Sequence, residues 1–183
     1  MNEDAVFRAK GGPSLLDNFK RTFERRRAER KTLRYDLRSG ATEEELDAAE
    51  RRLGLALPQA VRGFYSAFNG LFIQGPQALE ILEAGQLELD SKSNLVPFAR
   101  IYRAHLVCFD TKVLNQAGQW PIVFARTGHH ITDSIGSFLS NKLWKFVDSD
   151  DTRFPSVNYL SPSATTRSPH PGLPRLLLIL LCQ

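Results

Sequence analysis

The sequence contains only two cysteines and one methionine, and it has no long hydrophobic run. Two isolated thiols, Cys108 and Cys182, do not make the disulfide framework of a small secreted domain, which favours a reducing compartment. The longest apolar run, 176–182, covers seven residues, far fewer than the roughly 20 that a helix needs to cross a bilayer. Residues 1–12 include acids and no apolar segment, unlike a secretory signal. We therefore expect a soluble, cytoplasmic protein.

The residue spacings that catalytic and metal sites require are also missing. His129 and His130 are adjacent, and no Cys or His follows at zinc-site spacing, which favours a polar loop. If 105–110 is a strand, His105 and Cys108 point to opposite faces, so they cannot form a nucleophile pair and Cys108 is a core residue. The acids of 43–50 are explained by helix capping and a solvated face. We expect no catalytic residue, no metal and no cofactor.

The composition is that of one globular domain with extensions. Of the 183 residues, 42% are hydrophobic and 24% are charged, which is ordinary for a soluble fold. The net charge of +4 hides an asymmetry, because residues 1–40 carry +5 and residues 41–90 carry −6. We expect an extension over 1–38, a domain over 39–150, and a Pro-rich, disordered tail over 151–183. Whether the final leucines dock or are a reading-frame artefact stays open.

Helical patterns occupy the first part of the chain. Ser14 predicts the start of a helix to about Lys31, with an apolar face in its first half and a charged second half. Thr42 and Glu45 have capping-box spacing, and Gly54 suits the end of that helix. Pro58 is well placed as the first residue of a further helix that ends at 69–70.

The period then changes to that of strands, and returns to helical near the end. Short apolar runs lie at 71–73, 78–82 and 87–89, and stronger strand patterns at 94–101, 105–110 and 120–126, the last two as a hairpin. From Thr132 the apolar residues again share a helical face. This order predicts an α+β fold in which two N-terminal helices of the domain precede a mostly antiparallel sheet and a closing C-terminal helix.

The segment 41–70 resembles the opening of the SUKH superfamily, a capped helix, a Leu-Pro step and an aromatic-rich helix ending in Asn-Gly. The resemblance rests on Glu50, Gly54, Leu57, Pro58, Phe64, Tyr65, Asn69 and Gly70. It continues weakly through 95–101, 107–110 and 135–139. Most of these residues have backbone or packing reasons, so they identify a scaffold and no active site.

The resemblance implies a non-enzymatic bacterial immunity protein that binds and occludes a cognate polymorphic toxin, or a regulatory protein-interaction module. Many toxins neutralised by this family are nucleases with basic clefts, which an acidic surface would complement. The candidate partner-binding acids are Glu80, Glu83, Glu88 and Asp90. An ordinary charged surface is the alternative interpretation of these four residues.

The run Arg25, Arg26 and Arg27 is the sharpest basic feature. It is open to two interpretations, a surface for nucleic acid or an acidic partner, and a solvated helix with internal ion pairs. The interleaved acids favour the second, because Glu24–Arg27 and Arg25–Glu29 have the spacing of helical ion pairs.

Overall fold

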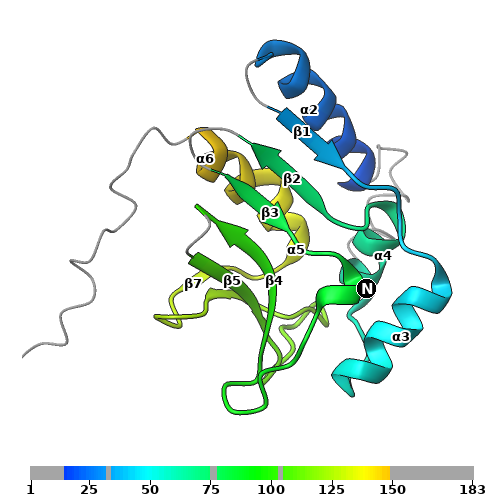
Figure 1. The fold of residues 1–183 in the computed structure, drawn as a ribbon. Helices are drawn as coiled ribbons and strands as arrows, with labels where there is room; N and C mark the ends of the chain where they lie inside the picture. The colour runs from blue at the N-terminus through cyan, green and yellow to red at the C-terminus, as the bar shows by residue number, and fades with distance from the viewer. Residues whose placement is uncertain (1–14, 32–33, 75–77, 103–104, 149–183) are drawn as a thin grey trace, which may run out of the picture. The chain divides into compact units, whose positions relative to one another are not determined.

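The computed structural model describes residues 15–31, 34–74, 78–102 and 105–148, and confirms the α+β prediction (Figure 1). Seven strands form one antiparallel sheet in which each strand pairs with the next along the chain. They are β1 (Arg34–Leu37), β2 (Leu71–Gln74), β3 (Leu79–Ile81), β4 (Leu95–Ile101), β5 (His105–Asp110), β6 (Ile122–Phe124) and β7 (His130–Thr132). The expected lead over 1–13, the cap at Ser14 and the tail lie outside the described residues.

Helices lie before, between and after the strands. Helix α2 (Leu15–Glu29) comes before β1, and α3 (Glu43–Leu53) and α4 (Gln59–Ala67) lie between β1 and β2. After β7 follow α5 (Ile135–Ser137), the π-helix η2 (Phe138–Lys142) and α6 (Leu143–Asp148). The 3₁₀ turn η1 (Ala84–Gln86) follows β3. No helix of the described residues is long and apolar enough to span a bilayer.

The local signals around α3 are confirmed in atomic detail. The Thr42 hydroxyl accepts from the amide of Glu45 at 3.3 Å, and the Glu45 carboxylate accepts from the Thr42 amide at 2.8 Å. Gly54 ends the helix with φ +67°, a left-handed conformation that glycine adopts cheaply. Pro58 is extended and precedes α4 instead of opening it, since the helix begins at Gln59.

The core lies between one face of the sheet and the closing helices α5, η2 and α6 (Figure 1). Phe98 and Phe109 stack with ring centroids 4.1 Å apart, and Phe138 of η2 meets Phe98 edge-on at 5.3 Å. All three side chains are fully buried. The predicted closing helix is therefore present, beginning after Ser134, whose hydroxyl accepts from the amide of Ser137.

The structure corrects two local expectations. The segment 87–89 is not a strand, because Leu87 follows η1 and its carbonyl accepts a 3.0 Å hydrogen bond from Nε of Arg52. The pair His129 and His130 is not simply a loop, since His130 opens β7 and its Nε2 lies 2.9 Å from Oδ1 of Asp133. Strand β1 was not expected from the sequence, and it adds an edge to the sheet.

Helix α2 packs on the core through two phenylalanines. Phe19 and Phe23 are buried, with Phe19 edge-on to Phe68 at a centroid distance of 5.7 Å. Phe23 contacts the rings of Tyr35 on β1 and Trp144 on α6. Helix α2 is thus in contact with Phe68, the residue after α4, and with the closing helix α6, while the separation of 1–38 as an extension stays a prediction.

Candidate interaction surface

A row of five side chains crosses the outer face of the sheet, away from the closing helices. Successive register pairs place Asp36 opposite Phe72, Phe72 opposite Glu80, Glu80 opposite Arg100 and Arg100 opposite Leu106. Side chains directly opposite each other in an antiparallel sheet have Cβ atoms about 5 Å apart. The row therefore forms one continuous strip over β1 to β5, and the exposure of Asp36, Arg100 and Leu106 shows that solvent reaches it.

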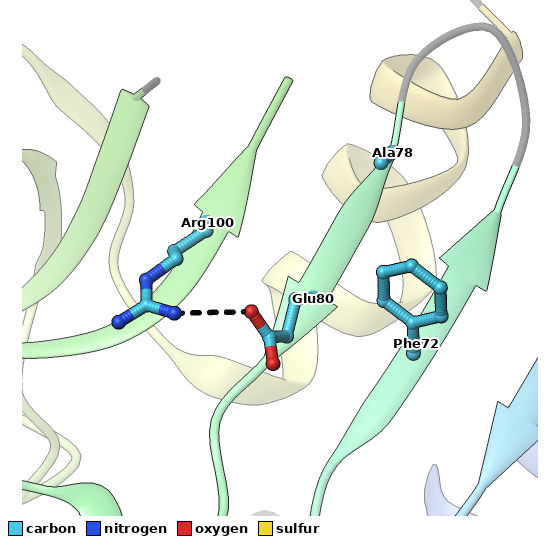
Figure 2. A pocket seen from close by; sticks show the side chains of 4 residues that line it. All are labelled: Phe72, Ala78, Glu80 and Arg100. Carbon is cyan, nitrogen blue, oxygen red and sulfur yellow. Dashed lines mark hydrogen bonds and ion pairs between the residues drawn. The ribbon is translucent and has the colours of Figure 1, made fainter. Parts of the chain in front are cut away.

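The middle of this row is hollowed. The hollow holds about 410 Å³ and is lined by Phe72, Ala78, Glu80 and Arg100 (Figure 2). Nη1 of Arg100 lies 3.3 Å from Oε2 of Glu80, a surface ion pair across β3 and β4. Arg100 is 49% exposed and Glu80 27%, so both charged groups remain accessible from solution.

Only one of the four candidate acids lines this hollow. Glu80 does so, whereas Glu83 forms an ion pair with Arg38 and Glu88 is an exposed side chain after η1. Asp90 belongs to a turn before β4, where its carboxylate accepts from the Ser93 hydroxyl at 2.6 Å and from the Lys92 amide at 3.0 Å. The hydrogen bond from Ser93 is the main reason that the pKa of Asp90 lies below its usual value.

Sequence reasoning missed Phe72, Arg100 and Leu106, although a signal was present. Residues of one strand alternate between faces, so Phe72 lies on the face opposite Leu71 and Ile73. Arg100 likewise interrupts an apolar strand. The alternation of side chains along a strand does not predict how neighbouring strands pair. It is this pairing register that brings Phe72, Arg100 and Leu106 into one row.

The residues that carry the family resemblance have structural tasks. Oδ1 of Asn69 accepts from the amide of Ala84 at 2.8 Å, which holds η1 against the end of α4. Gly70 has φ +101°, and a Cβ there would lie 2.9 Å from the carbonyl oxygen of Ile81. Leu57 and Pro58 are buried, and the Leu57 amide donates to the Glu50 carboxylate at 2.9 Å. These residues build the scaffold beside the sheet.

The acidic face of α3 is largely paired by one arginine. The guanidinium of Arg62 on α4 contacts Glu43 at 2.5 Å, Asp47 at 2.8 Å and Glu50 at 3.0 Å. Hydrogen bonds to these carboxylates, first that of Asp47, raise the pKa of Arg62. Much of the negative charge predicted for this half of the domain is therefore used to join α3 to α4.

Cysteine chemistry has no support in the geometry. Cys108 is fully buried, and burial raises the pKa of its thiol to about 12. Cys108 pairs in register with Pro97, whereas the exposed His105 pairs with Ile101 and points to the other face. The expectation that the two side chains do not meet is confirmed. Within the described ranges, no three His, Cys, Asp or Glu side chains are grouped to hold a metal.

Comparison with models of known protein families identifies the family of this domain. Residues 40–147 match the model of the SMI1/KNR4 family (SUKH-1), which is more than half of the chain. The chain belongs to this family. No curated protein matches the sequence closely enough to add a named relative. In this SMI1/KNR4 domain the matched residues run from the start of α3 almost to the end of α6, so α2 and β1 lie outside the match.

The basic run on α2 is partly engaged within the SMI1/KNR4 chain. Nε of Arg25 lies 3.9 Å from Oε1 of Glu29, as the helical spacing predicted. Nη1 of Arg26 lies 2.7 Å from Oδ2 of Asp148, and Arg30 contacts the other oxygen of that carboxylate at 2.9 Å. Of the three consecutive arginines, only Arg27 has no ion pair among the described residues.

Proposed function

We propose that this SMI1/KNR4 protein is a non-enzymatic immunity protein of bacterial origin, which binds a cognate polymorphic toxin and blocks it by occlusion. Family membership supports a protein-interaction role. The observation that carries the proposal is the accessible row on the outer sheet face, which combines an aromatic side chain, an ion pair and an exposed leucine. Protein interfaces are enriched in aromatic residues and arginine of this kind.

The row is also presented on rigid elements. Each of its members belongs to a strand of the seven-stranded sheet, and the opposite face of that sheet is packed against the closing helices. A preformed surface loses little conformational entropy when it binds, which favours tight association. Occlusion of a toxin requires such affinity and no turnover.

Two alternatives name other partners. A regulatory interaction module would use the same surface, so it differs from the proposal in its partner and not in its geometry. Nucleic-acid binding through α2 would require free arginines, but Arg25 and Arg26 are already paired with carboxylates. The nucleic-acid role therefore has the weaker support, and the capture experiment distinguishes the regulatory role from immunity by the identity of the partner.

The test uses the full chain as bait in a lysate of the cells that encode it. The full chain is needed because removal of α2 would expose Phe68 and Trp144, which Phe19 contacts. The captured polypeptide is then produced alone and its toxicity is measured with and without an equimolar amount of the bait. Loss of toxicity in the mixture supports the proposal. A partner whose activity is unchanged, or capture of nucleic acid alone, would contradict it.

A further inference from the structure

The hollow on the outer sheet face has an aromatic ring as one wall. Figure 2 shows Phe72 with its ring face turned toward the open side of the sheet, and Glu80 and Arg100 beside it across the hollow. The face of an aromatic ring carries partial negative charge and attracts cations within about 6 Å of its centroid. An accessible ring on a strand is thus a platform for a flat or cationic group.

Two acidic residues are the neighbours of Phe72 across the sheet, and Figure 2 shows the carboxylate of Glu80 turned toward Arg100. Asp36 is opposite Phe72 on one side and Glu80 on the other, because β2 lies between β1 and β3. Among the residues that the structure describes, no base lies within ion-pair distance of Asp36, and only one oxygen of Glu80 contacts Arg100. Asp36 does not line the hollow itself; it lies at its edge, next to Phe72. Arg34 lies one row further along β1, opposite Gln74, and Arg38, just after β1, forms an ion pair with Glu83; neither lines the hollow.

The charges around the hollow determine whether an acidic or a basic side chain of a partner would bind there. A carboxylate in the hollow would face the negative ring of Phe72 and the acid at 80, with the acid at 36 at the edge, and Arg100 is the one base of the lining that would favour it. An arginine side chain would stack its flat guanidinium on the ring and reach a carboxylate on either side. Among the residues that line the hollow, the only base that would oppose it is Arg100, which already competes for Glu80.

We propose that this hollow is a receptor for an arginine side chain of the protein partner, held between Asp36 and Glu80 on the ring of Phe72. Its identification as an arginine of the toxin rests on the proposed immunity function. The site itself is defined by the chemistry of the sheet face. An arginine from a basic toxin cleft is the complementary group that this face fits.

The first test uses a small probe in place of the unidentified toxin. The isotope-labelled full chain is titrated with the peptide acetyl-Gly-Arg-Gly-amide, and amide chemical shifts are followed by nuclear magnetic resonance. We expect saturable shifts centred on residues 36, 72 and 80, in the roughly millimolar range expected for a single side chain. The citrulline peptide, which has the same shape and no charge, is expected to bind at least about fivefold more weakly. Equal binding of the two peptides, or no saturable shift, would overturn the proposal.

Three variants test which residues contribute to binding of the arginine peptide. Phe72→Ala is expected to abolish the saturable shifts, because it removes the stacking platform. Arg100→Gln is expected to strengthen binding by about two- to fivefold, because Glu80 loses its competing partner. Glu88→Gln is the control, since it removes an exposed acid outside the hollow and should leave binding unchanged. If Arg100→Gln abolished binding of the arginine peptide instead, Arg100 would not be a competitor for Glu80 and the proposal would be wrong.

A single-stranded oligonucleotide is the competing probe, because nucleic-acid bases also stack on exposed rings. Oligonucleotide binding at Phe72 with no response to the arginine peptide would overturn the proposal in favour of nucleic acid. The peptide shifts are expected to persist unchanged when the oligonucleotide is added.

The last comparison distinguishes this inference from the proposed function. With a toxin that the wild-type chain neutralises, Phe72→Ala is expected to weaken binding by about tenfold or more, whereas Glu88→Gln does not. Neutralisation that is equally strong with Phe72→Ala would overturn the arginine receptor and leave the immunity role standing. Saturable peptide binding in a chain that neutralises no toxin would support the receptor and remove the immunity role.

Discussion

Arg26 lies over the indole ring of Trp144, with its guanidinium carbon 5.6 Å from the ring centroid, and its Nη1 lies 2.7 Å from a carboxylate oxygen of Asp148. The centre of the most basic run in the sequence is thus attached to the closing helix α6. A cation over an indole ring and beside a carboxylate is stabilised by both. A cluster of arginines in a sequence is therefore no sufficient sign of a nucleic-acid surface, because tertiary contacts can use the same charges.

Phe23 tests whether α2 is part of the stable core. Its side chain is 3% exposed and contacts Tyr35 and Trp144, so Phe23→Ala removes a packed aromatic ring. We expect the free energy of unfolding to fall by about 3–4 kcal/mol, measured by urea denaturation of the full chain. Val113→Ala is the control, because Val113 is 62% exposed and its truncation should change stability by less than about 0.5 kcal/mol. A similar, small effect of both variants would mean that α2 is not docked in solution.

The elements predicted well are those with strong local signals. Thr42 and Glu45 specify a helix start by themselves, and Gly54 specifies its end, so α3 was predictable without any knowledge of the fold. Strand β1 has no such signal, because it holds four residues and two of them are charged. It is a strand because Tyr35 and Leu37 pair with Ile73 and Leu71 of β2, a relationship that exists only in the folded chain.

The candidate surface was predictable only in part. Glu80 was recognised as an accessible acid, but sequence proximity grouped it with Glu83, which is held by Arg38 instead. Its actual neighbours, Phe72 and Arg100, lie 8 and 20 residues away in the sequence and are joined to it by strand register. Charge composition identifies an acidic region, whereas strand register decides which of its acids share one surface.

We expect the substitution of glycine by alanine to have opposite effects on stability at Gly40 and at Gly63. A Cβ at Gly40 would lie 1.9 Å from the carbonyl oxygen of Ser66, so Gly40→Ala forces the backbone of α4 away from the preceding loop. A Cβ at Gly63, inside α4, meets nothing within 4 Å. We expect Gly40→Ala to lower the unfolding free energy by about 2 kcal/mol or more and Gly63→Ala to raise it by about 0.5–1 kcal/mol. Thermal denaturation of the two variants beside the wild type measures both; destabilisation by Gly63→Ala would contradict the open space around that residue.

Arg62 predicts a salt-dependent contribution to stability. Its guanidinium contacts three carboxylates of α3, so Arg62→Gln leaves three like charges without their shared cation. We expect a loss of about 1 kcal/mol at low ionic strength, which shrinks in about 1 M salt because ions screen the repulsion. Arg25→Gln is the matched control, since its ion pair with Glu29 is long and exposed and should be worth less than about 0.5 kcal/mol. Equal losses of unfolding free energy in the two variants at low salt would show that the ion pairs of Arg62 stabilise the fold no more than a single exposed ion pair does.

The buried thiol of Cys108 predicts how stability responds to alkaline pH. Burial raises its pKa from 9.0 to about 12, so above pH 9 the unfolded chain loses this proton while the folded chain keeps it. The stabilisation is complete below about pH 9 and is lost as the pH rises toward 12. We compare wild type and Cys108→Ala, both with Cys182→Ser so that only one thiol differs. Between pH 8 and 10.5, the free energy of unfolding should fall by about 2 kcal/mol more with Cys108 than with alanine, whereas tyrosine titration affects both chains alike. Parallel pH profiles would mean that this thiol ionises as readily in the folded chain as in the unfolded one, and that Cys108 is not sealed between the strands.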